Sequence, residues 1–250
     1  MTKIPIIDST WFVVDKGVPT VQGVPSEERL RCASLLKPLY SWSAIKLNPF
    51  EKAPESWANL AQKAITVSSN TATTEMWEKC GADNIIGNLM TMTGMLWAYS
   101  PGYYGWGSVA INALDVAKAY CALLQAKDPE AAQILSWMTE VDNKQTFGIK
   151  SMLQKALKLD SSSIASKAGW YVDEKELRLR THLVFICKLS DQQYVGLVML
   201  TAKAVKKEFM NNYLAQYKHG EEVIGIHQSL MAATLKTEAL RLLKAYRLYI

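Results

Sequence analysis

The stretch Lys167–Lys203, KAGWYVDEKELRLRTHLVFICKLSDQQYVGLVMLTAK, differs in pattern from the segments on either side of it. It is rich in β-branched and aromatic residues, as strands are. Turn-forming residues near Asp173-Glu174 and Ser190-Asp191 divide it into three short segments. The stretch therefore predicts three consecutive strands, which constrains the fold of the whole chain.

Two more strands are predicted near the N-terminus, where Thr10–Val14 and Val18–Val24 flank the turn Asp15-Lys16-Gly17. Apolar residues at helical spacing predict helices over residues 34–47, 54–65, 113–124, 130–141 and 149–157, and in the C-terminal tail. Two strands, helices, three strands and then helices favour an antiparallel sheet over βαβ repeats. We predict a two-layer α+β fold with flanking helices and an all-helical subdomain.

The composition is that of an ordinary globular chain. Of its 250 residues 49% are hydrophobic, and its net charge of +5 is dispersed, so we expect no nucleic-acid partner. The four cysteines are far apart and the three histidines lack zinc-ligand spacing, so we expect buried free thiols, no metal and no cofactor. No export signal or 18-residue apolar segment is evident, so we expect no membrane association and a cytoplasmic location.

The stretch Arg31–Tyr40, RCASLLKPLY, places a serine and a lysine three residues apart among apolar residues. On a helix, Ser34 and Lys37 share a face, and apolar surroundings lower the pKa of a lysine so that it can act as a base. About one such S-x-x-K is expected by chance in a chain of this length. A serine that caps a helix, with an exposed lysine one turn later, is the alternative reading of this motif.

Two further polar clusters lie downstream, Ser68-Ser69-Asn70 and Lys167-Ala168-Gly169. With Ser34 and Lys37, in this order, they resemble the S-x-x-K, S-x-N and K-T-G motifs of the penicillin-binding protein and serine β-lactamase superfamily. The surrounding stretches CASLLKPLY, SSNTATTEMWEKCG, NALDVAKAYCALL and SKAGWYVD are similar to class A β-lactamase-like sequences. The resemblance implies a β-lactamase/transpeptidase-like single domain, 1–250, with sheet parts 1–31 and 165–250 and a helical subdomain 32–164.

The resemblance also implies a role for each motif residue. The catalytic residues would be the nucleophile Ser34, its base Lys37 and the proton relay Ser68. The backbone N–H groups of Ser34 and Trp170 would form the oxyanion hole. The substrate would contact Asn70, Lys167, Ala168 and Gly169, and the strand edge at Gly169 would accept the substrate backbone. We also expect Tyr103 and Tyr104 to bind substrate.

Six aromatic residues are candidates for the wall of a pocket, with core packing as the alternative. They are Trp42, Trp97, Tyr103, Tyr104, Trp106 and Trp170.

The sequence departs from the family pattern at two points. Between Asp83 and Asp115 there is no carboxylate, although class A β-lactamases carry a deacylating glutamate in the corresponding loop. Ala168 replaces the hydroxyl residue of K-T-G, which weakens recognition of a substrate carboxylate. The chain also begins almost directly at its first strand, so we expect the tail Lys206–Ile250 to cover the sheet.

The resemblance implies a serine acyl-enzyme hydrolase, esterase or transacylase. We expect it to act on an ester, amide or lactam of a small molecule, in a biosynthetic pathway, with efficient β-lactamase activity doubtful. A non-hydrolytic binding or sensor-like protein for β-lactams or peptides and a D-Ala-D-Ala-type peptidase are the alternatives. The sequence does not identify the oligomeric state.

Overall fold

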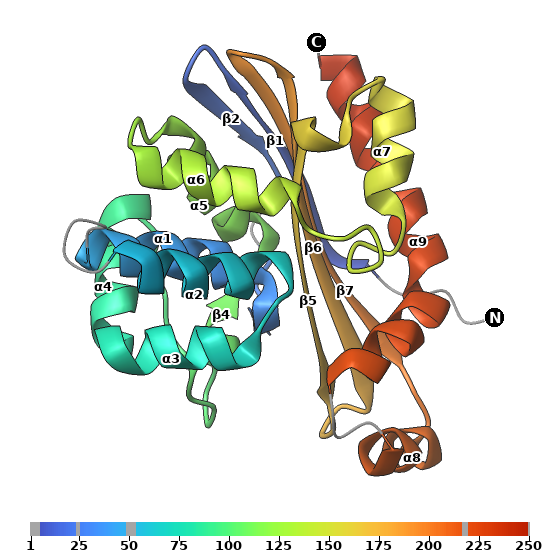
Figure 1. The fold of residues 1–250 in the computed structure, drawn as a ribbon. Coiled ribbons are helices and arrows are strands. Elements are labelled where there is room, and N and C mark those ends of the chain that lie inside the picture. Colours follow the sequence, from blue (N-terminus) through green and yellow to red (C-terminus); the bar gives the residue numbers. More distant parts are fainter. Residues whose placement is uncertain (1–5, 24–25, 49–53, 217–219, 250) are drawn as a thin grey trace.

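A five-stranded antiparallel sheet forms the centre of the molecule (Figure 1). The computed structural model describes residues 6–23, 26–48, 54–216 and 220–249. The strands are β1 (Ile6–Asp15), β2 (Val18–Gln22), β5 (Ile164–Asp173), β6 (Arg178–Ser190) and β7 (Gln193–Ala204), in the spatial order β2-β1-β7-β6-β5. β5 is therefore an edge strand.

Helices cover both faces of this sheet (Figure 1). One face carries α1 (Lys37–Leu47), α2 (Pro54–Thr66), α3 (Asn70–Cys80), α4 (Ala82–Thr93), α5 (Ala113–Gln125) and α6 (Pro129–Thr139). The other carries α7 (Ile149–Leu157), α8 (Lys207–Gln216) and α9 (Gly220–Tyr249). None of the helices within the described residues is both long and apolar enough to cross a membrane.

The alternation of side chains along the strands separates two hydrophobic cores. In β6, Val184 and Ile186 pack with the helices of the first face, whereas Leu183 and Phe185 pack with those of the second. Both sets are almost fully buried, so β6 has the continuous apolar character of a strand that is covered on both faces. The expected α+β fold with an antiparallel sheet is confirmed.

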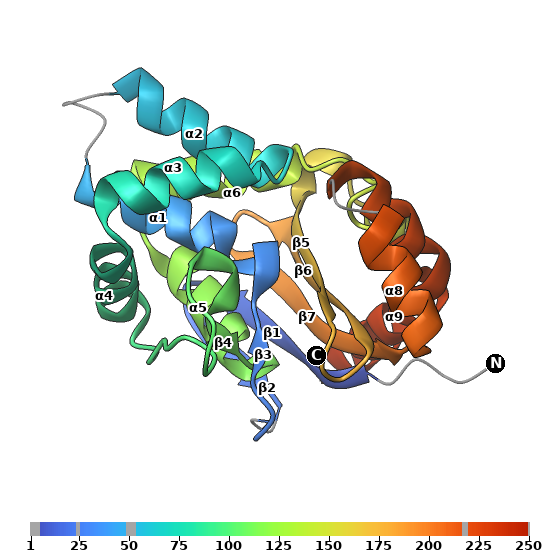
Figure 2. The same ribbon diagram turned by 90° about the horizontal axis from the view of Figure 1, so that it is seen from below.

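The C-terminal helix α9 covers the second face, as we expected of the tail. Its buried side chains, including Met231, Leu235, Leu242 and Tyr246, pack on β1, β6 and β7. The turned view shows α8 and α9 together on this side of the sheet (Figure 2). The tail is thus part of the core.

The sequence did not predict two very short strands. β3 (Leu30–Arg31) and β4 (Ala110–Ile111) pair with each other as a second, two-stranded sheet. The 3₁₀ turn η1 (Ala33–Leu36) follows β3, so Ser34 lies just before α1 rather than in a helix that begins at Ser34. Residue 24, the end of the expected second strand, lies outside the described residues.

Replacing Leu235 by alanine tests the contact between α9 and the sheet. Leu235 is fully buried, whereas Leu240 on the same helix is 46% exposed. Leu235→Ala should lower the free energy of unfolding by about 2–5 kcal/mol, because it leaves a cavity in the second core. Leu240→Ala should cost less than about 1 kcal/mol. Urea denaturation measures both, and equal effects would show that α9 does not pack as described.

Candidate active site

Ser34 lies on the turn η1 between the strand β3 and the helix α1. The preceding residue, Ala33, has a positive φ of 48°, which is unusual for a residue other than glycine. The turn is held by a hydrogen bond from Leu35 N to Cys32 O, and Tyr120 Oη donates to Leu35 O from α5. The serine is thus presented on a strained and well-anchored turn, as reactive residues often are.

Lys37, the first residue of α1, is fully buried beneath this turn. Its Nζ donates to Ser68 O at 2.6 Å and to Asn70 Oδ1 at 2.8 Å, and it lies 4.5 Å from the centre of the Trp106 ring. From the sequence we expected Lys37 to share a helix face with Ser34 and to act as its base. Its hydrogen bonds go instead to the second motif, and none joins it to Ser34 within the described residues.

The second motif occupies the junction between α2 and α3. Ser69 caps α3, with its Oγ accepting from Ala72 N at 3.2 Å, which fixes the residues on either side of it. Ser68 has a positive φ of 57°, so it is the second strained residue at the site. Its carbonyl accepts from Lys37 and its hydroxyl accepts from Lys167 Nζ at 2.8 Å.

Lys167 on β5 is also fully buried, and its Nζ makes a second hydrogen bond to Ala168 O at 3.0 Å. Ser68 therefore accepts hydrogen bonds from two lysines, from Lys37 at its carbonyl and from Lys167 at its hydroxyl. Burial lowers the pKa of Lys167 to about 7. Burial, together with the charge of Lys167, lowers the pKa of Lys37 to about 6. Near neutral pH this site contains two lysines that are poised to gain or lose a proton.

Gly169 allows β5 to lie directly against the turn η1. A Cβ at this position would be 2.7 Å from Leu35 N and 2.9 Å from both Ser34 N and Cys32 O, so only glycine fits. The sequence led us to expect that this glycine makes room for the substrate backbone. In the structure Gly169 instead lies against the backbone of η1, the turn that carries Ser34.

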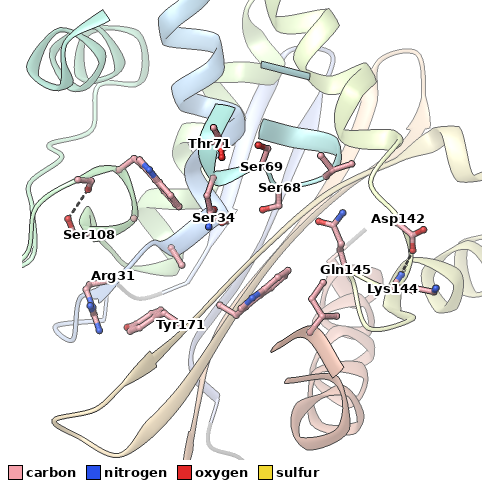
Figure 3. Close-up of a pocket in the computed structure, with 18 of the residues that line it drawn as sticks. Arg31, Ser34, Ser68, Ser69, Thr71, Ser108, Asp142, Lys144, Gln145 and Tyr171 are labelled. Carbon is pink, nitrogen blue, oxygen red and sulfur yellow. Dashed lines mark hydrogen bonds between the residues drawn. The ribbon is translucent and has the colours of Figure 1, made fainter. Parts of the chain in front are cut away.

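Three of the motif residues border a cavity of about 1260 Å³ (Figure 3). Ser34, Ser68 and Asn70 line it, as do four of the expected aromatic residues, Tyr103, Tyr104, Trp106 and Trp170. Trp42 and Trp97 do not line this cavity and are buried in the first core, which confirms the alternative reading for these two. Lys37, Lys167, Ala168 and Gly169 lie behind the wall and do not line the cavity.

The loop between α4 and β4, residues 94–109, forms one side of the cavity without a carboxylate. The loop is held in place at Trp106: the Trp106 carbonyl accepts hydrogen bonds from Tyr40 Oη and Cys32 Sγ, and the side-chain Nε1 of Trp106 donates to Thr74 Oγ1. Asp115 is paired with Arg29 at 2.9 Å, and neither it nor Asp83 lines the cavity. Among the described lining residues the one carboxylate is Asp142, which follows α6.

Several lining residues were missed by the sequence reading. They are Arg31, Val67, Ser69, Thr71, Ser108, Asp142, Lys144, Gln145, Tyr171, Ile224 and Gln228, together with Ala33, Gly105, Gly107 and Gly225. Strand alternation from Lys167 and Gly169 was a usable signal for Tyr171. For the lining residues of α9 and of the segment after α6, no local sequence pattern indicated a place at the cavity.

The cysteines do not offer a competing nucleophile. All four are buried free thiols, as expected, and burial raises the pKa of Cys32, the cysteine nearest to Ser34 in sequence, to about 12. No group of three or more His, Cys, Asp or Glu side chains that could hold a metal occurs in the described part of the chain. The reactive groups at the cavity are hydroxyls and amines.

This fold, an antiparallel sheet with a helical layer that carries the serine turn, is that of the class A β-lactamases. An ancestral class A β-lactamase superposes with a TM-score of 0.56 at 13% identity, over 80% of this chain and 87% of that one. The TLA-3 extended-spectrum β-lactamase gives 0.55 at 13% identity, over 82% and 88%. The β-lactamase from Desulfarculus baarsii gives 0.54 at 12% identity, over 81% and 87%.

These identities are low, so the similarity establishes the fold alone. No protein-family model matches the sequence, and no curated protein is significantly similar to it.

Replacing Gly169 by alanine tests the contact between β5 and η1. The added methyl group would meet backbone atoms of Leu35, Ser34 and Cys32, so β5 and the turn must separate. We expect labelling of Ser34 by a fluorophosphonate to fall at least about 10-fold, because displacements well below 1 Å disturb reacting groups. Gly225→Ala, at a lining residue with open space around it, is the matched control and should label normally.

The buried lysine Lys37 should make stability depend on pH. Its pKa is lowered from 10.5 to about 6 in the folded state, so the unfolded chain binds the additional proton between these values. The buried lysine therefore destabilises the fold most at and below pH 6. As pH rises from 6 towards 10 the free energy of unfolding increases, by at most about 1.4 kcal/mol per pH unit.

Urea denaturation of wild type and Lys37→Met across this range measures the effect, and the advantage of the variant should shrink with rising pH. Lys46→Met removes a partly exposed, ion-paired lysine from the same helix and should show no such trend. A difference between wild type and Lys37→Met that is constant from pH 6 to 9 would contradict a lowered pKa.

Proposed function

We propose that this protein is a serine hydrolase or transacylase that forms an acyl-enzyme on Ser34. The observation that carries the proposal is the pair of buried lysines, Lys37 and Lys167, that meet at Ser68 beside the cavity containing Ser34. A serine needs a neighbouring base to become a nucleophile, and a lysine can be that base only when its pKa is lowered. The lowered pKa of Lys37, about 6, and its position at the start of the helix that follows the Ser34 turn support it as that base.

The chemistry follows from these positions. Neutral Lys37 takes the proton of Ser34, and Ser34 Oγ forms a bond to the carbonyl carbon of an ester, amide or lactam. N–H groups of the turn and of the edge strand at Trp170 stabilise the oxyanion. The bond to the leaving group then breaks, Ser68 passes its hydroxyl proton to the leaving group, and protonated Lys37 returns the proton taken from Ser34 to Ser68. Protonated Lys167 holds the Ser68 hydroxyl in place and is the source of positive potential.

Substrate contacts form the second part of the proposal. Tyr103, Tyr104 and Asn70 line the cavity, so they are available to a substrate. Ala168 lacks a hydroxyl, so the strand motif offers less to a substrate carboxylate than K-T-G does. The substrate is a small molecule, and we retain the predictions of a cytoplasmic location and a biosynthetic role.

A sensor or trap that keeps its acyl group is the second candidate. The absence of a carboxylate from residues 84–114 favours it, because that is where a deacylating glutamate would be expected. The lifetime of the adduct separates the two. Loss within minutes, or on addition of an amine or alcohol acceptor, supports turnover, whereas persistence over hours with every acceptor supports a sensor. Cleavage of a D-Ala-D-Ala dipeptide would instead identify a peptidase.

Intact-mass spectrometry with an activated ester, a β-lactam and a fluorophosphonate tests the nucleophile. We expect one covalent adduct on wild type, located on the peptide that contains Ser34, and none on Ser34→Ala. The acylation rate should fall as pH drops through about 6, because protonation of Lys37 removes the base. Equal labelling of Ser34→Ala, or a rate independent of pH between 5 and 8, would overturn the proposal.

A further inference from the structure

The side chain of Arg31 lies at one end of the cavity and contacts two aromatic rings. Its guanidinium carbon is 4.0 Å from the centre of the Tyr103 ring and 4.4 Å from that of Tyr171. All three residues line the cavity. Two ring contacts fix the orientation of the guanidinium and leave its N–H groups to bond in its own plane. One of them donates to Val172 O over a long 3.4 Å.

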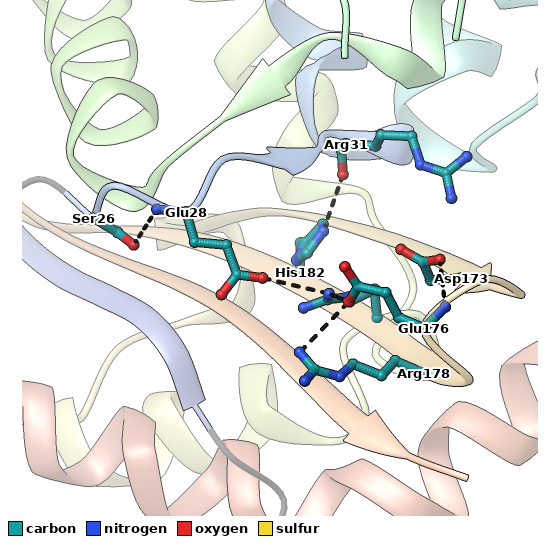
Figure 4. Close-up of polar contacts among 8 residues, drawn as sticks. Ser26, Glu28, Arg31, Asp173, Glu176, Arg178 and His182 are labelled. Atoms are coloured by element: carbon teal, nitrogen blue, oxygen red, sulfur yellow. Dashed lines mark hydrogen bonds and ion pairs between the residues drawn. The ribbon is translucent and has the colours of Figure 1, made fainter. Parts of the chain in front are cut away.

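The backbone of Arg31 is fixed as well. Its carbonyl is 3.1 Å from His182 Nε2, which donates to it, and β3 pairs with β4 at this residue (Figure 4). Burial lowers the pKa of His182 to about 3, so the ring stays neutral and keeps this arrangement over the physiological range. The arginine is thus held in position before any ligand binds.

The charge of Arg31 is not neutralised by the protein. Of the acidic side chains near Arg31, Glu28 and Glu176 pair with the buried Arg180, and Asp173 accepts a hydrogen bond from Glu176 N at 3.2 Å (Figure 4). Among the described residues no carboxylate lies within ion-pair distance of Arg31. A partly buried guanidinium with no acidic partner at a cavity wall is arranged to receive an anion.

We infer that Arg31 is the receptor for a carboxylate of the substrate, and that this selects acids among the acyl compounds that Ser34 attacks. The inference rests on the proposed function and names the substrate class of the same site.

The geometry favours a carboxylate over a phosphate. A planar carboxylate can pair with the guanidinium edge to edge while the guanidinium keeps its contacts with the rings of Tyr103 and Tyr171. A phosphate dianion calls for more donors, and the other cation that lines the cavity, Lys144, lies beside Asp142 at the opposite end (Figure 3). The far end therefore suits a neutral or polar part of the substrate.

Matched esters test the inference. In one pair the acyl part differs, p-nitrophenyl hydrogen glutarate against p-nitrophenyl valerate. In the other the leaving group differs, 3-carboxyphenyl acetate against phenyl acetate. For wild type we expect the acid to have the higher kcat/KM in at least one pair. In Arg31→Gln the kcat/KM of the acidic ester divided by that of the neutral ester in the same pair should fall by about 10–100-fold, because the substrate carboxylate loses its partner.

Controls separate this effect from a loss of folding or of long-range charge. Arg31→Lys keeps the charge without the planar fork and should lie between wild type and Arg31→Gln. Lys175→Gln removes a cation 5.6 Å from the Tyr103 ring that does not line the cavity, and the ratio should change less than about 2-fold. Turnover of the neutral ester by each variant reports on its folding.

The outcomes distinguish the two proposals. Suppose that the neutral esters acylate Ser34 but that Arg31→Gln leaves the kcat/KM ratio of both ester pairs unchanged. The assignment of Arg31 as carboxylate receptor is then wrong, and the proposed function stands. If no ester acylates Ser34, calorimetry on Ser34→Ala with the same acids decides. Binding weakened at least 10-fold by Arg31→Gln would support the receptor without the proposed chemistry, and no difference would refute both.

Discussion

The close approach of β5 to the turn η1 is the contact on which the rest of the site depends. It occurs where Gly169 lacks a side chain, so the edge of the sheet touches the backbone of Ser34 and Leu35. The same approach brings Lys167 to Ser68 and places the N–H groups of an edge strand next to the serine. Sheet and helical layer are thereby joined at the one place where a reacting carbonyl would bind.

Burying two lysines at this junction is costly, and it indicates what the site is built for. A buried ammonium group is unfavourable unless it is well bonded, and removing such groups commonly stabilises a protein. Lys37 and Lys167 bond mainly to carbonyl and hydroxyl oxygens rather than to carboxylates, so their charges are solvated without being neutralised. Their pKa values can therefore lie near neutrality, which a salt bridge would prevent.

Part of the fold and of the candidate site could be predicted from the sequence, because some structural features leave a local sequence pattern and others do not. Strand and helix patterns predicted the main sheet and most of the helices, and short motifs marked Ser34, Lys37, Ser68 and Lys167. The partners of Lys37 depend on how α2 returns to α1, which no spacing encodes. Arg31 was missed for a similar reason, since β3 and β4 are two residues long and carry no period.

Within the proposed function, the way in which the acyl group leaves Ser34 depends on the loop that borders the cavity. Residues 94–109 are held by their backbone and contain no carboxylate, so that loop supplies no general base. The base that took the proton of Ser34 is neutral again once the leaving group has departed, and by microscopic reversibility it can deprotonate the incoming nucleophile. A cavity of about 1260 Å³ is large enough to hold an acceptor beside the acyl group. A bound acceptor gains from proximity in a way that a passing water does not, so within the proposed function acyl transfer is favoured over hydrolysis.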